Sequence, residues 1–577
     1  MDTQASQGSL QRGYKIIRAG SLRRAWIAAG LVLAAACARP AAAQSPDARA
    51  LVEQAAKAMG GLAALRALKS EVIESEGKQF EHASAKRPGD PSRQTGRFRY
   101  TLTRDLARPR LRLDWNSQRL GARAESIHYL EVIDAGGALD AGGGLNVAVG
   151  LLEEGGKQSR LHPARLATRL REEKRSAVNL ILTALGEKSL RRLDAAEGRK
   201  GAAIVAFVDG GGEFRVYFDP RTKLPFMTEI LEDDPIEGDS RYALRYSDWR
   251  KTDGVLIPYA LRYELNGRPL QEERLLSVRH NVALYPETFA VPDAVRSEKA
   301  DARPIASQWL IRRVAGNVSY QDLGRSPPVE MVRLADGVYS AQGTSHNSIV
   351  IEMRDHLVVV EAPLYDARSQ AVIRAVKERF PGKPIRYLIP THFHIDHAGG
   401  VRGYMAEGAI VAAPELARQF YGCMARAPHT LRPDALEKSG RLVTIESADG
   451  ARALSDGSRE IVIYPLPNSH ADDMQVVYLP REKILIEADL ANPRQNRVRA
   501  GPGAAELLAG IEKLGLDVAT IAGIHGDTAD LAALKAAAKA APPAADDLVE
   551  KSPPPAGESA AGAIVETSLG AAGGPGC

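Results

Sequence analysis

The stretch THFHIDHAGG at residues 391–400 constrains the fold of this 577-residue chain more than any other. It places four side chains with metal-binding chemistry within six positions: His392, His394, Asp396 and His397. Burying so many imidazole and carboxylate groups is unfavourable unless each has a partner, and a metal ion supplies such partners. Residues two apart in an extended loop face the same side, so His392 and His394 can bind one ion. Asp396 and His397 can then face a second ion beside it.

Strands and helices alternate around this stretch. Apolar segments of strand length are expected at Ser348–Met353, His356–Val360 and Arg386–Ile389, and apolar spacing predicts a helix over Asp366–Phe380. Such alternation is typical of a layered α/β domain. Ligand sites in these folds lie in loops at strand ends, which is where the motif lies.

Further candidate ligands follow other apolar strands. These residues are His470, Asp489 and His525. Each lies at the end of a predicted strand, where an α/β sandwich gathers its ligands. The imidazole-rich donor set favours zinc, with iron or manganese as alternatives.

With the H-x-H-x-D-H motif complete and the later His, Asp and His in order, residues 328–540 resemble the metallo-β-lactamase superfamily. The resemblance implies an αββα sandwich that binds two metal ions. It assigns the first metal to His392, His394 and His470. It assigns the second to Asp396, His397 and His525, with Asp489 as the bridging ligand.

The expected activity is hydrolysis by a hydroxide held between the two metal ions. Asp396 is the candidate catalytic residue that orients this nucleophile, as its counterparts do in relatives. The resemblance favours an ester, lactone, thioester or related bond, because Asp489 stands where true β-lactamases usually have Cys or Ser. β-Lactamase activity is one alternative. A periplasmic binding or carrier protein with a non-catalytic metallo domain is another.

Other residues near the predicted site are open to two interpretations. Glu361, in VVVEAP, is either a support for a metal ligand or an ordinary acid at a strand end. His346 is expected to lie at the surface, although an early loop approaches the site in relatives. Three arginines can meet an anionic substrate group or form a solvated basic loop. These are Arg494, Arg497 and Arg499.

Residues 46–305 are expected to form a β-rich (α+β) domain. A helix is predicted to begin near Ala48, a hairpin to turn at Asn266-Gly267, and a helical stretch to span Ala164–Leu193. Segments such as YFDPRTKLPFMTEI resemble the half-barrels of periplasmic lipoprotein carriers, which implies a concave apolar surface able to hold a lipid or another hydrophobic ligand. The alternative is a scaffold or docking domain. The remaining histidines receive no role: His82, His128, His162, His280 and His429.

The chain begins with a predicted bacterial signal peptide, residues 1–43. Arg23 and Arg24 precede an apolar run, and small residues follow before Gln44. The mature chain is therefore expected in the periplasm or outside the cell, with no transmembrane segment. Lipid anchoring at Cys37 is the alternative. The other two cysteines, Cys423 and Cys577, are expected to be unrelated thiols, although they could pair in an oxidising compartment.

The ends and the charge complete the predicted organisation. Residues 306–327 form a linker, and the Pro- and Ala-rich residues 541–577 form a disordered tail. The balance of 76 basic and 71 acidic residues gives a net charge of +5 and a mixed surface, so a nucleic acid is not the expected partner. The expected partner is a small-molecule substrate.

Overall fold

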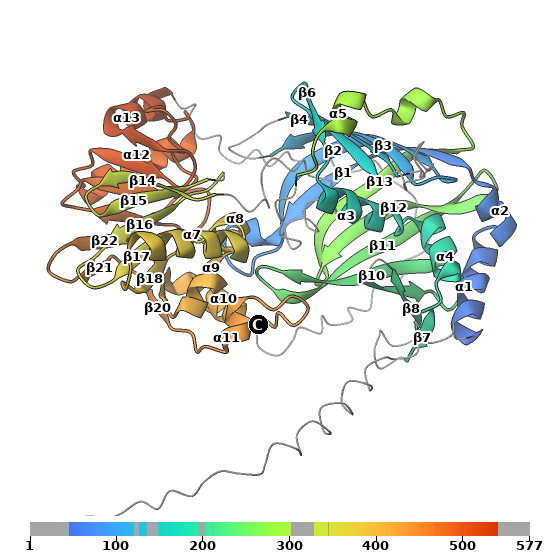
Figure 1. Ribbon diagram of the computed structural model, residues 1–577, viewed down its shortest axis with the longest axis horizontal. Helices are drawn as coiled ribbons and strands as arrows, with labels where there is room; N and C mark the ends of the chain where they lie inside the picture. Colours follow the sequence, from blue (N-terminus) through green and yellow to red (C-terminus); the bar gives the residue numbers. More distant parts are fainter. Residues whose placement is uncertain are drawn as a thin grey trace, which may run out of the picture.

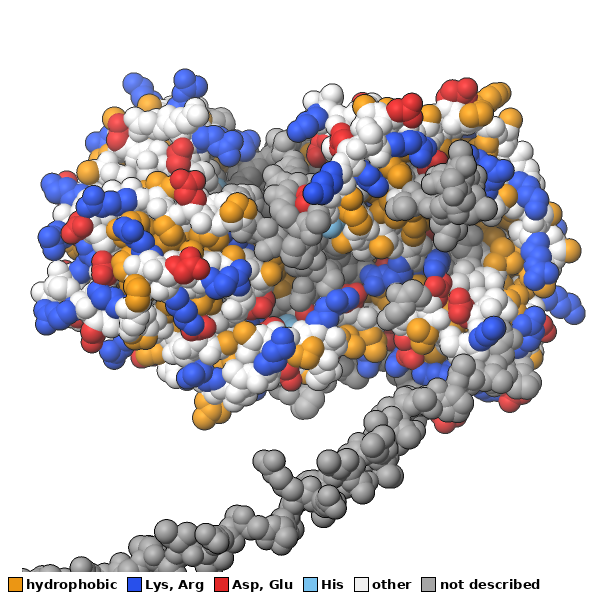
Figure 2. All heavy atoms as spheres, viewed as in Figure 1, with side chains coloured by type: hydrophobic (Ala, Val, Ile, Leu, Met, Phe, Trp, Pro, Cys, Tyr) orange, Lys and Arg blue, Asp and Glu red, His pale blue; other side chains and the backbone are white. Residues whose placement is uncertain are grey.

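The computed structural model describes residues 46–120, 126–135, 148–194, 202–209, 212–301, 328–343 and 345–540. The predicted signal peptide, linker and tail lie outside these residues, as do Cys37 and Cys577. Two bodies lie side by side along the long axis (Figure 1). None of the helices within the described ranges is long and apolar enough to cross a membrane. Basic and acidic side chains are interspersed over the face seen in Figure 2.

The N-terminal body is built on one 13-stranded antiparallel sheet, in the order β6-β5-β4-β3-β2-β1-β13-β12-β11-β10-β9-β8-β7. Its strands are β1 (Ser70–Glu81), β2 (Arg93–Asp105), β3 (Arg110–Arg119), β4 (Ser126–Asp134), β5 (Val149–Glu154), β6 (Lys157–Arg160), β7 (Arg191–Leu193), β8 (Ala203–Asp209), β9 (Gly212–Phe218), β10 (Pro225–Asp234), β11 (Gly238–Thr252), β12 (Val255–Leu265) and β13 (Arg268–His280). Its helices are α1 (Pro46–Ala58), α2 (Leu62–Ala67), η1 (His82–Ser84), α3 (Pro163–Glu173), α4 (Ala177–Gly186), η3 (Pro286–Phe289) and α5 (Asp293–Ser297).

Helices α1 and α4 cover one face of this sheet and share its main hydrophobic core. Aromatic rings stack across neighbouring strands there, with the Phe98 and Trp115 centroids 4.4 Å apart. The cavity left beside α3 and α4 measures about 80 Å³ and is lined by charged as well as apolar side chains, including Arg104 and Glu273. That volume suits a few water molecules. A second hollow, beside α1 and strands β7 to β9, measures about 340 Å³.

In this body the predicted hairpin turn is confirmed, and the predicted long helical stretch is partly wrong. The Asn266-Gly267 turn joins β12 to β13 with positive φ at both residues. The helical stretch expected over Ala164–Leu193 is instead two helices, α3 and α4, followed by strand β7. Arg175, between the two helices, donates hydrogen bonds to carbonyls of β10 and β11, so tertiary contacts break the helix.

The C-terminal body has two sheets. The first contains β14 (Glu330–Ala335), β15 (Val338–Gln342), β16 (Ser348–Glu352), β17 (Leu357–Val360), β18 (Ile385–Ile389), β19 (Ile410–Pro414) and β20 (Ile445–Ala448). The second contains β21 (Arg452–Ser455), β22 (Glu460–Pro465), β23 (Gln475–Leu479), β24 (Ile484–Glu487), β25 (Thr520–Gly523) and β26 (Thr528–Asp530). The helices are α7 (Asp366–Arg379), α8 (Ile395–Ala398), α9 (Val401–Glu407), α10 (Glu415–Arg426), α11 (Ala435–Ser439), α12 (Pro502–Leu514) and α13 (Leu531–Ala540).

Strand β17 shows why these elements form layers. All four of its residues are buried, and successive side chains point to opposite faces. Leu357 and Val359 pack in the core under α7 and α9, whereas Val358 and Val360 pack against the second sheet. Helices α12 and α13 cover the far face of that second sheet. The expected αββα sandwich is therefore confirmed.

One cysteine expectation is wrong. Cys423 on α10 is disulfide-bonded, so it is not an unrelated free thiol. Its partner lies outside the described residues.

A buried ion cluster in the N-terminal body gives a stability prediction. Glu131 on β4 binds Arg165 and Arg169 on α3 at 2.9 and 3.2 Å, and none of the three side chains is more than 6% exposed. Burial alone would raise the pKa of Glu131, but the two guanidinium groups outweigh it and lower that pKa from 4.5 to about 2. The carboxylate therefore stabilises the fold above pH 4.5, and this stabilisation is lost as the pH falls towards 2.

We expect Glu131→Gln to lower the free energy of unfolding at pH 7 by about 3 kcal/mol, and by less at pH 3. Denaturant unfolding followed by tryptophan fluorescence measures this. Glu76→Gln is the matched control, because Glu76 binds two arginines in the same way at the surface and its loss should matter much less. Equal losses in both variants would contradict the prediction.

Candidate metal centre

All seven ligand residues predicted from the sequence meet at one edge of the sandwich. They come from the loops that follow β18, β22, β24 and β25 and from the short helix α8. Their candidate donor atoms form groups within which all atoms lie within 4.8 Å of one another. The groups are His392, His394 and His470; His392, His397 and Asp489; and His346, Asp396, His397 and His525.

The Asp489 carboxylate lies at the centre of the cluster. The Nε2 atoms of four histidines lie within 3.4 Å of its oxygens: 2.8 Å for His397, 3.1 Å for His525, 3.3 Å for His470 and 3.4 Å for His392. Such convergence on one carboxylate is the arrangement required of a ligand shared by two ions.

The loop of Asp489 is held by a buried glutamate at the end of β24. The carboxylate of Glu487 accepts hydrogen bonds from the backbone N–H groups of Leu490, Ala491 and Asn492. Asp489 itself has a φ of 65°, a left-handed conformation that is strained for a residue with a side chain. Glu487 therefore secures a backbone shape that aims the Asp489 carboxylate at the histidines.

A chain of hydrogen bonds through Glu361 orients two histidines. The hydroxyl of Thr391 donates to Glu361 Oε2 at 2.6 Å, so its oxygen can accept the Nδ1–H of His392 at 3.0 Å. His397 Nδ1 donates to the same Glu361 oxygen at 3.0 Å. In their neutral form both rings then carry the proton on Nδ1 and direct the Nε2 lone pair at the centre. Of the two interpretations of Glu361, the structure supports the role of orienting ligands.

The protons of two further histidines are placed by backbone carbonyls. His525 Nδ1 donates to the carbonyl of Ser345 at 3.2 Å, which leaves Nε2 for the centre. His394 differs, because its Nε2 donates to the carbonyl of Ala85 at 2.8 Å. A carbonyl only accepts, so the lone pair of His394 lies on Nδ1. Ala85 belongs to the N-terminal body, and nothing in the sequence marked it.

The electrostatics of the cluster suit a metal-binding site. Burial, and then the neighbouring imidazoles, lower the pKa of His392 well below its ordinary value. Burial and then His470 lower the pKa of His394 to about 4. Neutral imidazoles are the form that binds metal ions, so His392 and His394 suit a divalent cation. At His397 three carboxylates outweigh burial and raise the pKa well above its ordinary value, so this ring would lose a proton on binding a cation.

His346 was expected at the surface, and the structure places it in the cluster. Its side chain is 4% exposed, and its Nε2 lies 3.5 Å from Asp396 Oδ2. Its ring lies 4.0 Å from that of His525, centroid to centroid. The loop between β15 and β16 carries it, and the early loop that approaches the site in relatives was the hint of this placement.

Solvent reaches the cluster along Asp396 and His470. Their side chains are 31% and 29% exposed, whereas the His392 side chain is fully buried. Arg494, Arg497 and Arg499 are exposed in the loop after Asp489. Their contact with an anionic substrate therefore stays a prediction.

A close backbone approach explains the glycines of the motif. A Cβ on Gly399 would lie 2.1 Å from the carbonyl oxygen of Leu364, and one on Gly400 would lie 2.2 Å from the hydroxyl of Ser369. Side chains at these positions would push the ligand loop away from α7.

The αββα sandwich and the histidine and aspartate cluster at its edge together have the form of a metallohydrolase domain. Residues 341–537 match the metallo-beta-lactamase superfamily. An 81-residue segment is 30% identical to the alkyl/aryl-sulfatase BDS1 of Saccharomyces cerevisiae, covering 14% of this chain and 12% of the sulfatase. A metallo-beta-lactamase type 2 of Elizabethkingia meningoseptica is 21% identical over 188 residues, which are 31% of this chain and 69% of that protein.

Among solved structures, a metallo-beta-lactamase from Pontibacter korlensis covers 37% of this chain and 97% of its own, with 16% identity and a TM-score of 0.29. The match across residues 341–537 makes this part of the chain a metallo-β-lactamase superfamily domain.

The hydrogen bonds of Glu361 yield a prediction. We expect Glu361→Gln to weaken zinc binding by about 10- to 100-fold, because the neutral amide is a weaker acceptor for Thr391 and His397 than the carboxylate, and its NH2 group cannot accept the N–H of Thr391. Competition with a chromogenic chelator measures the affinity. Glu460→Gln changes an exposed glutamate of the same domain and should leave zinc binding unchanged. Unaltered affinity in Glu361→Gln would show that the hydrogen bonds do not support the ligands.

Proposed function

We propose that the chain is an exported, zinc-dependent hydrolase with two metal ions per chain. The observation that carries the proposal is the convergence of four imidazole Nε2 atoms on the Asp489 carboxylate. Hydrogen bonds to Glu361, Thr391 and Ser345 leave imidazole lone pairs directed at one carboxylate. A histidine cluster with only a structural role has no need of such an arrangement.

The residues divide between holding metal and handling the nucleophile. His392, His394 and His470 would hold one ion, Asp396, His397 and His525 the other, and Asp489 would bridge them. Two divalent ions lower the pKa of water towards neutrality and polarise the bond to be cleaved. The Asp396 side chain is 31% exposed, and His397 and His346 outweigh the partial burial of its carboxyl group and hold its pKa well below the ordinary value. As an ionised carboxylate it can accept a hydrogen bond from the attacking water and orient it.

The proposed substrates are small molecules with an ester, lactone, thioester or related bond. The short match to an alkyl/aryl-sulfatase adds sulfate esters to these classes. β-Lactams are a second candidate, supported by the match to a metallo-beta-lactamase type 2. A lipid or another hydrophobic group remains a proposed ligand of the N-terminal body, which has hollows of about 80 and 340 Å³.

The decisive experiment is hydrolysis by the zinc-loaded full chain of a panel of chromogenic substrates: an ester, a lactone, a thioester, a sulfate ester, a β-lactam and a phosphodiester. We expect turnover of one of the first four classes. Turnover of the β-lactam alone would select the second candidate. Silence across the panel, in a protein that holds two zinc ions, would contradict the proposal and favour a periplasmic binding or carrier protein.

Variants connect any turnover to the cluster. We expect His392→Ala and Asp489→Ala to reduce turnover on the order of 10³-fold or more and to lower the zinc content, because each removes a ligand at the centre. Circular dichroism should show the N-terminal body still folded. His128→Ala is the matched control, since His128 is an exposed histidine on β4. Full activity with metal retained in either cluster variant would exclude the dinuclear centre.

A further inference from the structure

The connection between β1 and β2 lies buried against the C-terminal body. We call its residues 82–87 the docking loop. Ala83 and Ala85 are each 2% exposed, and Ala83 belongs to the hydrophobic core beneath helices α7 and α9 of the metallo-β-lactamase domain. Ile236, from the turn between β10 and β11, joins the same core. The N-terminal body thus completes the apolar core of its neighbour.

The docking loop holds one metal-ligand candidate directly. The carbonyl of Ala85 accepts the Nε2–H of His394 at 2.8 Å, and both residues are buried. Histidine ligands usually need such an acceptor, which fixes both the protonated nitrogen and the plane of the ring. For His397 and His525 the acceptors belong to the metallo-β-lactamase domain itself. For His394 the acceptor comes from the other body.

The docking loop also holds the segment that carries His470. The N–H of Asp472 donates to the carbonyl of Lys86 at 2.9 Å, and the Lys86 ammonium donates to the carbonyl of Asn468 at 3.0 Å. Arg87 forms an ion pair with the Asp472 carboxylate. Within the segment, the side chain of Asn468 accepts the N–H of His470 at 2.7 Å. The docking loop therefore contacts residues both before and after His470 in the chain.

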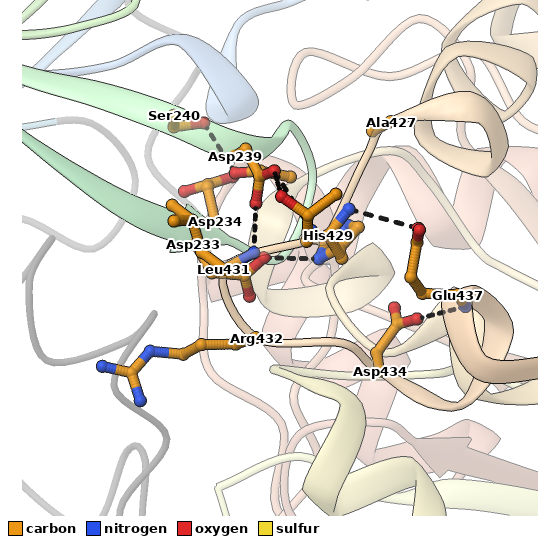
Figure 3. Close-up of polar contacts among 12 residues, drawn as sticks. Asp233, Asp234, Asp239, Ser240, Ala427, His429, Leu431, Arg432, Asp434 and Glu437 are labelled. Atoms are coloured by element: carbon orange, nitrogen blue, oxygen red, sulfur yellow. Dashed lines mark hydrogen bonds and ion pairs between the residues drawn. The ribbon is translucent and has the colours of Figure 1, made fainter. Parts of the chain in front are cut away.

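A second set of contacts joins the hairpin β10–β11 to the loop between α10 and α11 (Figure 3). The Asp239 carboxylate on β11 accepts hydrogen bonds from the backbone of Thr430 and Leu431, and His429 pairs with Asp233 at 2.6 Å. A Cβ on Gly238 would lie 2.1 Å from the carbonyl of Pro428, so the two bodies meet without a gap there. These residues lie in the hairpin β10–β11 and in the loop between α10 and α11.

The hairpin and the docking loop are themselves joined. His82 Nε2 lies 2.5 Å from the Glu237 carboxylate, and Glu237 is also paired with Arg268. His82 and His429, which received no role from the sequence, therefore both lie in contacts that set the position of the docking loop.

From these contacts we propose that the N-terminal body is part of the metal centre: its docking loop positions His394 and His470, and so sets the affinity of the first metal site. The proposal rests on the metal binding proposed above. It makes the β-rich domain a positioning element for two ligands. The second site takes its support from within the metallo-β-lactamase domain and should not depend on docking.

The test is zinc titration of the full chain against a competing chelator, which yields two affinities. Ala83→Arg places a large charged side chain in the buried contact. It should weaken the binding of one of the two zinc ions by about 10- to 100-fold. The milder double variant Lys86→Ala with Arg87→Ala removes largely exposed side chains, so it should fold and weaken the same ion by a smaller factor. Ala107→Arg is the matched control on an exposed turn of the same domain.

Combined variants identify the affected site. In a His394→Ala background Ala83→Arg should have little further effect on zinc binding, whereas in a His525→Ala background it should still weaken the remaining ion. Unchanged affinities in Ala83→Arg and in the double variant, or equal loss of both ions, would overturn the inference while leaving the proposed hydrolase intact. A wild-type chain that binds no zinc would instead overturn the proposed function.

Discussion

The arrangement at this site depends on the convergence of four imidazoles on the Asp489 carboxylate. So many buried histidines cannot all be charged, because each raises the cost of protonating the next. The low pKa of His392 follows from burial and from this constraint, whereas at His397 three carboxylates outweigh burial and raise the pKa. Hydrogen bonds to Glu361, Thr391 and Ser345 also determine which nitrogen of each bonded histidine carries the proton.

The backbone near the centre is strained in the places that aim these groups. Glu361 and Asp489 have φ values of 80° and 65°, and Leu364, against which Gly399 packs, has a φ of 71°. Such conformations persist only where the surroundings leave no alternative. Here three backbone hydrogen bonds to Glu487 and the two buried sheets supply that constraint. Rigidity at the sheet edge is thus the condition for a preformed ligand set.

The two bodies are coupled through the docking loop. A β-rich domain joined only by a flexible linker would move freely relative to the site. Here it contributes Ala83 to the neighbouring core and a carbonyl to His394, so its position and the orientation of two candidate ligands are linked. The β-rich domain thus acts as a scaffold, and its docking loop contacts the candidate metal ligands.

The sequence by itself determined the sandwich and its seven predicted ligands, because apolar periodicity and motif spacing are local properties. The strands around THFHIDHAGG and helix α7 lie where their apolar patterns placed them. Other features depend on residues far apart in the chain. Arg175, where helix α3 has ended, is held by hydrogen bonds to β10 and β11. His346 lies in the cluster because β15 and β16 place its loop there. Ala85 accepts a hydrogen bond from His394, which lies 309 positions away in the chain. Only the tertiary structure decided these, since a hydrogen bond between distant residues, above all one to a backbone carbonyl, leaves no pattern in either segment.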